Sequence, residues 1–510
     1  MKTSRFLILL AVLAACTDTN VGDLTAPTSV AKTPTGIQNV VTGLFFSARI
    51  DVGNYIYATS AFGRDAGNFT NTEPRWITEG LALTPIAFND FFWSQWEWDT
   101  EYNNIELANN IVASIAKVVP AYGTAQASAI SGIVRTMKAL QYMMIAETHD
   151  TLGVSLYSPG AATPQPIYCN RDVWRYIVAL LDSANADLNA AGSIAPPVTL
   201  PSGFGAVGST VAPSTAQGSF AAFNRALAGK AGLQLAYAIA RQSGAGPTPT
   251  TAGSPDVAAL TRADSAIKAS ALFNPSAITT PAAGGFSTND AYGVYHVFSP
   301  QSGDLTNPVN GIIGTYVVLW DLVADVDTVN DARWKAKFAP IPAQNLPVQQ
   351  STFSPVASPY TYAYYPTTGS PVPIVRDEEL TLVDAQIQLG LGALTNAMTL
   401  VNNVHQQAGG YATPLVVPSD YVHVRDALLK EQRISTAIEA SGDRTFSIRM
   451  YDMAAIADTT WQAHSGPDSA GVASVKQNTG TAPTDYHTTV LPIEETEIDG
   501  RGGHISLTCP

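Results

Sequence analysis

Residues 98–118 read WDTEYNNIELANNIVASIAKV, and this stretch decides the fold class. Its apolar side chains recur every three or four positions, so they share one face of a helix. Residues 126–147 repeat the pattern. The apolar positions are Tyr102, Ile105, Ala108, Ile111 and Ile115 in the first stretch, and Ile130, Val134, Met137, Leu140 and Met144 in the second. Two consecutive amphipathic helices joined by a short connection predict a helical hairpin.

The same periodicity extends outward in both directions. A helix is predicted from about Thr35, which we assign as its N-cap, and another from Asn170, also a capping residue type. Further helices are expected at 220–241, 256–272, 378–407 and 420–440. Helices that come mostly as consecutive pairs are typical of tetratricopeptide-like arrays, although no strict repeat of about 34 residues is present. The sequence therefore predicts a mainly α fold.

The N-terminus predicts export and lipid anchoring. Lys2 and Arg5 accompany an apolar run at 6–12 that is too short to span a bilayer, and Leu-Ala-Ala-Cys16 follows. This ending resembles a bacterial lipobox, in which the Cys16 thiol carries acyl chains such as palmitate and becomes the new N-terminus. The alternative is an ordinary cleavage site that ends in Cys. Residues 1–15 are then the signal peptide and 16–34, rich in Thr, Asp, Ala and Pro, a flexible tether.

Composition favours a neutral ligand. The 510 residues carry a net charge of −14, which becomes −16 when Lys2 and Arg5 leave with the signal peptide. Only 13% of residues are charged, against about 25% in ordinary soluble proteins, while 46% are hydrophobic. Nucleic acid and anionic lipid need basic surface, so both are excluded as main partners.

Two stretches, 189–224 and 338–375, have no charged residue at all. They are rich in Pro, Gly, Ser and Thr, and the second contains Tyr360, Tyr362, Tyr364 and Tyr365. We expect long surface loops with short strands, which on a rigid helical scaffold can also build a binding face.

Cysteine usage leaves two interpretations open. With Cys16 lipidated, Cys169 and Cys509 remain, and in an oxidising compartment they either form a bridge or stay as two isolated thiols. We favour isolated thiols, because two cysteines are too few for a disulfide framework. No Cys-x-x-Cys occurs, so neither zinc binding nor thiol redox chemistry is indicated.

Motifs for catalysis and metal binding are nearly absent. The seven histidines show no His-Glu-x-x-His spacing, and there is no Gly-x-Ser-x-Gly elbow or phosphate loop. Asp325, Asp327, Asn330 and Asp331 form an oxygen-rich group, but it lacks the Gly and terminal Glu of an EF-hand calcium loop. We therefore expect no catalytic residues, no metal and no cofactor, with calcium near Asp325 and Asp327 as the alternative.

Aromatic residues are the other candidate chemistry, because neutral sugars stack on aromatic rings. Residues 91–98 hold Phe91, Phe92 and three tryptophans. Trp98 continues the apolar face of its helix and is assigned to the core, while Trp93 and Trp96 are equally compatible with the core and with a ligand platform. Further candidates in loop-like surroundings are Trp76, Tyr292, Tyr295 and Trp320.

Several short segments, in chain order, resemble the SusD/RagB family of outer-membrane nutrient-binding lipoproteins. They are Trp98-x3-Tyr102-x2-Ile105-x2-Ala108-Asn109, the helix end YMMIAETHDTLG at 142–153, the helix after Asp172, Asp331-Ala332-Arg333, LVNNVHQQAG at 400–409, Glu431 and Arg433 with Gly442 and Arg444, and Leu491-Pro492-Ile493 before Glu497-Ile498. The chain departs from the family pattern where Gly153-Val154-Ser155 replaces a Tyr-Gly-Asp-Val-Pro turn, where His405 and Gln407 replace two arginines, and at Ser441. These departures mark a divergent member.

The resemblance implies tetratricopeptide-like helix pairs packed beside a loop-rich part with a few short strands. Residues 35–510 would form one SusD-like domain, with the helical scaffold at about 35–275 and 376–460 and the loop-rich part at about 276–375 and 461–510. It also implies a lipid-anchored protein on the outer face of the outer membrane that captures a nutrient, usually an oligosaccharide, and passes it to a SusC-like TonB-dependent transporter. A surface glycan-degrading enzyme and a protein-binding structural lipoprotein are the alternatives.

Overall fold

The computed structural model describes residues 33–70, 73–81, 97–156, 165–246, 251, 253–278, 285–286, 290–310, 316–342 and 357–451, together with 491, 493 and 497. The predicted signal peptide, Cys16, Trp93, Trp96 and Cys509 lie outside these ranges, as does nearly all of the predicted tether.

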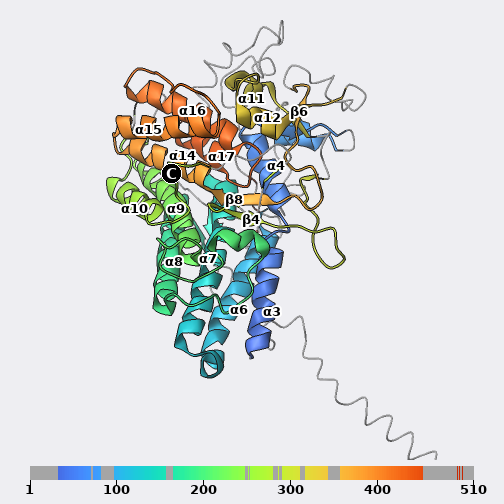
Figure 1. The fold of residues 1–510 in the computed structure, drawn as a ribbon, viewed down its shortest axis with the longest axis vertical. Coiled ribbons are helices and arrows are strands. Elements are labelled where there is room, and N and C mark those ends of the chain that lie inside the picture. The colour runs from blue at the N-terminus through green and yellow to red at the C-terminus, as the bar shows by residue number, and fades with distance from the viewer. Residues whose placement is uncertain are drawn as a thin grey trace, which may run out of the picture.

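Most described residues belong to helices, as the periodicity predicts. Figure 1 shows α3, α6, α7 and α8 side by side, and each helix from α6 to α9 packs on the next one in the chain. The long helices are α3 (Pro34–Ser47), α4 (Val52–Phe62), α6 (Asp99–Tyr122), α7 (Thr124–His149), α8 (Asn170–Ala191), α9 (Phe220–Gln242), α10 (Val257–Lys268), α14 (Asp377–Gly390), α15 (Leu394–Gln407), α16 (Tyr421–Thr436) and α17 (Asp443–Met450). This succession of antiparallel pairs is the predicted tetratricopeptide-like array. No described helix has the length and apolar character that a membrane crossing requires.

The helix faces follow the sequence pattern. Ile105, Ala108 and Ile111 of α6 are buried, whereas α7, which has α6 on one side and α8 on the other, is buried around almost its whole circumference. At Gly132 a side chain would meet Leu188 of α8, because the two helices approach closely there. The helical array and its connections share one large core.

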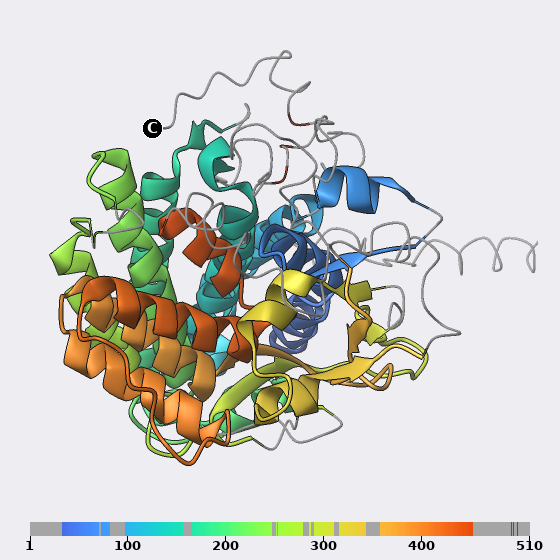
Figure 2. The same cartoon turned by 90° about the horizontal axis from the view of Figure 1, so that it is seen from above.

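Short strands lie beside the array rather than in a continuous sheet. Four antiparallel pairs occur among the described residues. Figure 2 shows α14–α16 grouped together on one side of the molecule. The strands are β1 (Ala66–Asn68) with β5 (Tyr316–Val318), β2 (Val154–Ser155) with β3 (Ile167–Tyr168), β4 (Gly293–His296) with β8 (Val372–Arg376), and β6 (Phe338–Pro340) with β7 (Tyr360–Tyr362). Short helices η1 (Trp76–Gly80), α11 (Trp320–Asp325) and α12 (Ala332–Lys337) accompany them.

The charge-free stretches are partly interior in the parts that are described, the second more than the first. Tyr362, Tyr364 and Tyr365 are fully buried in a second, aromatic core, and Tyr362 and Tyr365 donate hydrogen bonds to backbone carbonyl groups. In the other stretch, Phe204 packs against Phe45 in the main core. These segments are neutral because much of them is interior, where an unpaired charge is costly.

Local predictions were wrong at four points. The 378–407 helix is two helices, because the chain turns at Gly392, whose φ is +75°. Thr33, not Thr35, caps α3, since its side chain accepts the Gly36 N–H. Cys169, not Asn170, stands before α8, and Asn170 is its first residue. Cys169 is disulfide-bonded, so the interpretation as an isolated thiol fails for this residue.

Candidate ligand-binding site

The predicted aromatic residues do not form one surface. Tyr295 is wrong as a ligand candidate, because it is 1% exposed on β4 and its hydroxyl donates to Asp290 at 2.9 Å. Tyr292, the residue just before β4, is half-buried, and its backbone carbonyl accepts the Asp377 N–H at 3.1 Å.

Trp76 and Trp320 remain candidates by position. Both are half-buried, Trp76 in η1 after β1 and Trp320 directly after the β5 segment, and these two strands pair. The Trp76 ring meets Tyr57 edge-on with 6.2 Å between centroids, so part of it serves the aromatic core. Trp98 is buried against His149, as expected for a core residue.

A cavity of about 360 Å³ lies between α11–α12 and α16, under the loop at 408–420. We call it the α11–α16 cavity. Its wall combines the Tyr411 ring with aliphatic side chains, Leu415 and Val417 among them, and with charged groups that include Asp327 and Lys430. A mostly apolar hollow with a few fixed polar groups is the usual form of a small-molecule site.

Tyr411 is held rigidly in this wall. Its ring stacks on the His405 imidazole, with 4.0 Å between centroids and 4° between planes. A side chain at Gly409 would come within 2.8 Å of the Tyr411 ring, and the Gly409 carbonyl accepts the Ala332 N–H from α12 at 2.9 Å. The loop is thereby tied to α12, and one face of the ring is covered by His405.

The Tyr411 hydroxyl is free to bind a ligand. Among the residues that the structure describes, none forms a hydrogen bond with it. Burial, followed by the nearby charges of Asp331 and Asp327, raises the pKa of Tyr411 to about 12. The phenol is therefore protonated at neutral pH and can donate a hydrogen bond.

The floor of the cavity is a buried ion network. Arg333 is 1% exposed and donates to Asp331 and Glu431, each at 2.6 Å, and to the Ser435 hydroxyl at 3.0 Å. Burial alone would raise the pKa of Glu431, but Arg333 and the contact with His405 bring it below its usual value. Because these groups satisfy one another, the floor is closed and rigid.

The rim is more open and more polar. Hydrogen bonds from the side chain and backbone of Asn330 lower the pKa of Asp327, which is therefore ionised. Lys430 is exposed, and no ion pair involves it within the described ranges. Val329 and Val416, on the two loops that bound the mouth, are 70% and 92% exposed.

The geometry does not support the alternative of a calcium site near Asp325 and Asp327. Asp325 forms an ion pair with Arg433, and Asp327 is engaged by Asn330. In the described part of the chain, no three His, Cys, Asp or Glu side chains are placed to hold a metal ion.

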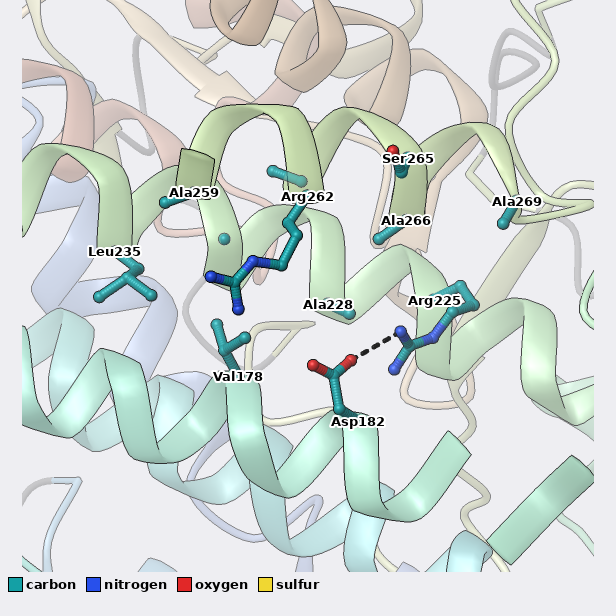
Figure 3. A pocket seen from close by; sticks show the side chains of 12 residues that line it. Val178, Asp182, Arg225, Ala228, Leu235, Ala259, Arg262, Ser265, Ala266 and Ala269 are labelled. Atoms are coloured by element: carbon teal, nitrogen blue, oxygen red, sulfur yellow. Dashed lines mark hydrogen bonds and ion pairs between the residues drawn. The ribbon is translucent and has the colours of Figure 1, made fainter. Parts of the chain in front are cut away.

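A second hollow, of about 250 Å³, lies on the helical array (Figure 3). Its floor consists of small side chains from α9 and α10, such as Ala228 and Ala266. Arg225 and Asp182 pair across it at 2.8 Å, and the Arg262 side chain extends over it. It contains no aromatic ring, so it offers no stacking surface for a sugar.

Sequence reasoning missed the α11–α16 cavity because its parts come from three separate segments. One signal was available: Leu415-Val416-Val417 is an apolar run between Pro414 and Pro418 in a connection between helices. Such a run in a loop needs either core contact or a ligand to cover it.

Comparison with known proteins identifies the architecture. No protein-family model and no curated protein matches the sequence. A crystal structure of a SusD homolog from Bacteroides thetaiotaomicron superposes with a TM-score of 0.65 at 15% identity, over 94% of this chain and 98% of that one. The chain has the SusD fold. A SusD superfamily protein from Bacteroides vulgatus superposes with a TM-score of 0.59 at 14% identity, over 92% of this chain and 97% of that one.

A third solved structure adds a functional description of a protein with the SusD fold. Surface glycan-binding protein A from Bacteroides thetaiotaomicron matches with a TM-score of 0.56 at 13% identity, over 94% of this chain and 99% of that one. At such identities the likeness concerns the fold, and site chemistry has to be argued from this chain's own residues.

Proposed function

We propose that this protein binds a glycan at the cell surface without cleaving it. The observation that carries the proposal is the α11–α16 cavity, in which a rigid tyrosine ring stands beside ionised and hydrogen-bonding groups. A pyranose ring presents a face of C–H bonds to an aromatic ring and hydroxyl groups to polar side chains. Proteins of the SusD fold that are described as carbohydrate-binding or glycan-binding support the same assignment.

Trp76, Trp320 and Tyr292 are secondary candidates for further sugar contacts. Each is half-buried, so each residue keeps some exposed surface. Trp93 and Trp96 remain predictions from the sequence.

The lipobox supports a location on the outer membrane. Acyl chains on Cys16 would anchor the mature chain, and residues 17–34 would hold the domain away from the bilayer. We propose that the domain faces the exterior and passes its glycan to a SusC-like TonB-dependent transporter.

Binding without catalysis fits the electrostatics of the cavity. Glycoside hydrolysis generally needs a carboxylic acid whose pKa is raised enough to donate a proton. Here the pKa values of Glu431 and Asp327 are both lowered, so neither is suited to that role. A protein-binding role is the second candidate, supported by the exposed Val329 and Val416 at the mouth.

The proposal is tested by calorimetry of the purified chain against linear gluco-oligosaccharides with α-1,4, β-1,4, β-1,3 and β-1,2 linkages. We expect binding of at least one series, no release of shorter products, and weaker binding by Tyr411→Ala. Cleavage would establish an enzyme. Absence of binding to every series, with co-purification of a protein partner, would favour the second candidate.

A further inference from the structure

We propose that the α11–α16 cavity receives the end of a glycan chain, one or two terminal sugar rings, rather than an internal stretch of a long chain. This inference rests on the proposed function and adds the form of the ligand. Three features of the cavity carry it: its closed floor, its single stacking face and its volume.

The closed floor prevents a chain from passing through the bottom of the cavity. Arg333 and Asp331 are 1% and 3% exposed and are linked to Glu431 and Ser435 by hydrogen bonds of 2.6–3.0 Å. Parting these groups would leave charges buried without partners, which is strongly unfavourable. A ligand that reaches the floor therefore has to end there.

The stacking surface is limited to one ring. His405 covers one face of Tyr411 at 4.0 Å, so a single face is available to a sugar. The rest of the lining consists of aliphatic side chains such as Leu415 and Ala427, of charged groups and of the His423 imidazole, and among the described residues it includes no other Phe, Tyr or Trp ring. A long glycan held along its length would need several aromatic platforms in succession, and the lining of this cavity contains one.

The volume matches a short ligand. A water molecule occupies roughly 30 Å³ in the liquid, so 360 Å³ equals about 12 water molecules. One hexopyranose unit has a similar number of non-hydrogen atoms. One ring fits at liquid density. The tighter packing of a protein interior, about 0.75 against roughly 0.5–0.6 in liquids, adds at most about half to that capacity, so a second ring would project from the mouth.

Polar groups at the mouth suit the hydroxyl groups of a chain end. Lys430 and the Tyr411 hydroxyl can donate, and the Asp327 carboxylate can accept. A terminal ring has hydroxyl groups that an internal ring loses to glycosidic bonds, so it offers these side chains more partners.

The test measures affinity against chain length for the series that the purified protein binds, from monosaccharide to hexasaccharide. For an α-1,4 or β-1,2 series the comparison includes a closed ring without chain ends, α-cyclodextrin or cyclic glucan. For a β-1,4 or β-1,3 series a long polymer, in which chain ends are scarce, takes the place of the cyclic form. We expect affinity to rise up to the disaccharide and then change less than about twofold. The cyclic form should bind at least about tenfold more weakly, since one stacking contact and several hydrogen bonds are lost.

Variants locate the effect. Tyr411→Ala should lose about tenfold in affinity for the disaccharide, and Tyr411→Phe, which keeps the ring, should lose less. Tyr168→Ala is the matched control, because Tyr168 is exposed on β3, outside the cavity lining. Thermal melting of each variant checks that it is folded.

Three outcomes would overturn the inference while leaving glycan binding intact. They are affinity that keeps rising beyond the trisaccharide, equal binding of linear and cyclic forms, and binding unaffected by Tyr411→Ala. Absence of binding to every oligosaccharide would instead remove the proposed function itself.

Discussion

The buried pair Glu97 and Glu101 predicts a specific dependence of stability on pH. Both side chains lie at the start of α6 and are at most 1% exposed. Neither oxygen of Glu97 and only one of Glu101 has a hydrogen-bond donor among the described groups, and Glu97 has an unusual φ of +54°. Two carboxylates in this position cannot both be ionised, so they retain protons at neutral pH.

The sign and size of this pH dependence of stability follow from the pKa values of the two carboxyl groups. Burial and the charge of Asp51 raise the pKa of Glu101 to about 8, and burial and the charge of Glu101 also raise the pKa of Glu97 well above its ordinary value. The folded state therefore keeps a proton that the unfolded chain releases above about pH 4.5. The stabilisation is complete below that pH and is lost as the pH rises to about 8. Between about pH 5 and pH 8, the titration of Glu101 alone lowers the free energy of unfolding by on the order of 3 kcal/mol.

Glu101→Gln removes this titration and keeps the shape of the side chain. We measure the free energy of unfolding of the variant and of wild type with guanidinium chloride at about pH 5 and pH 8. We expect the difference, variant minus wild type, to be larger at pH 8 than at pH 5 by on the order of 3 kcal/mol. The difference isolates Glu101 from other groups that titrate there, such as Glu147, whose pKa burial raises to about 7. Glu106→Gln, an exposed change on the same helix, is the control. A constant difference between Glu101→Gln and wild type at all pH values would refute the reasoning.

Three further predictions concern packing and charge. Arg333→Met should lower the free energy of unfolding by about 3–5 kcal/mol, because Asp331 and Glu431 stay buried without their cation. Arg175→Met, at an exposed ion pair, is the control and should lower it by less than about 1 kcal/mol. Denaturant titration measures both values, and equal losses in the two variants would contradict the prediction. Gly132→Ala should lower Tm because its Cβ would lie 2.6 Å from Leu188, while Gly43→Ala, with nothing within 4 Å, should raise stability by about 1 kcal/mol. Gly409→Ala should disturb the end of α15 and displace the Tyr411 ring, because its Cβ would lie 2.5 Å from the His405 carbonyl oxygen and 2.8 Å from the ring. Glycan binding should weaken about tenfold, and unchanged affinity in calorimetry of the folded variant would exclude this ring as the platform.

Helical periodicity predicted the array because helix formation depends on neighbours in sequence. The apolar positions of α6 and α7 could be read directly, since each helix buries a face at a spacing of three and four residues. The division between α14 and α15 was missed, because it depends on the positive φ of a single glycine, Gly392. Apolar periodicity continues across that turn in the sequence.

The site was harder to predict because its members meet only in the folded chain. Tyr411 follows α15, Asp327 precedes α12 and Lys430 belongs to α16. The tyrosine-rich segments suggested a binding surface, but Tyr295 and Tyr364 belong to the aromatic core between the strands and α16. Aromatic composition alone does not separate a core, where hydroxyl groups find backbone partners, from a sugar platform, where a hydroxyl group remains free.

Several residues that carry the sequence resemblance form the floor and the frame of the α11–α16 cavity. Asp331, Arg333 and Glu431 are buried in one ion network, and Arg433 is buried between Asp65 and Asp325. These ion pairs fix α11 and α12 relative to α16. The Tyr411 side of the cavity depends on His405, one of the positions where this chain departs from the pattern in the resemblance, because its imidazole stacks on the Tyr411 ring. An arginine there could also stack on the ring, but its charge beside Arg333 would change the partners of Glu431. Specificity in this chain should therefore follow substitutions at 405 and 411 more closely than any change in the shared motifs.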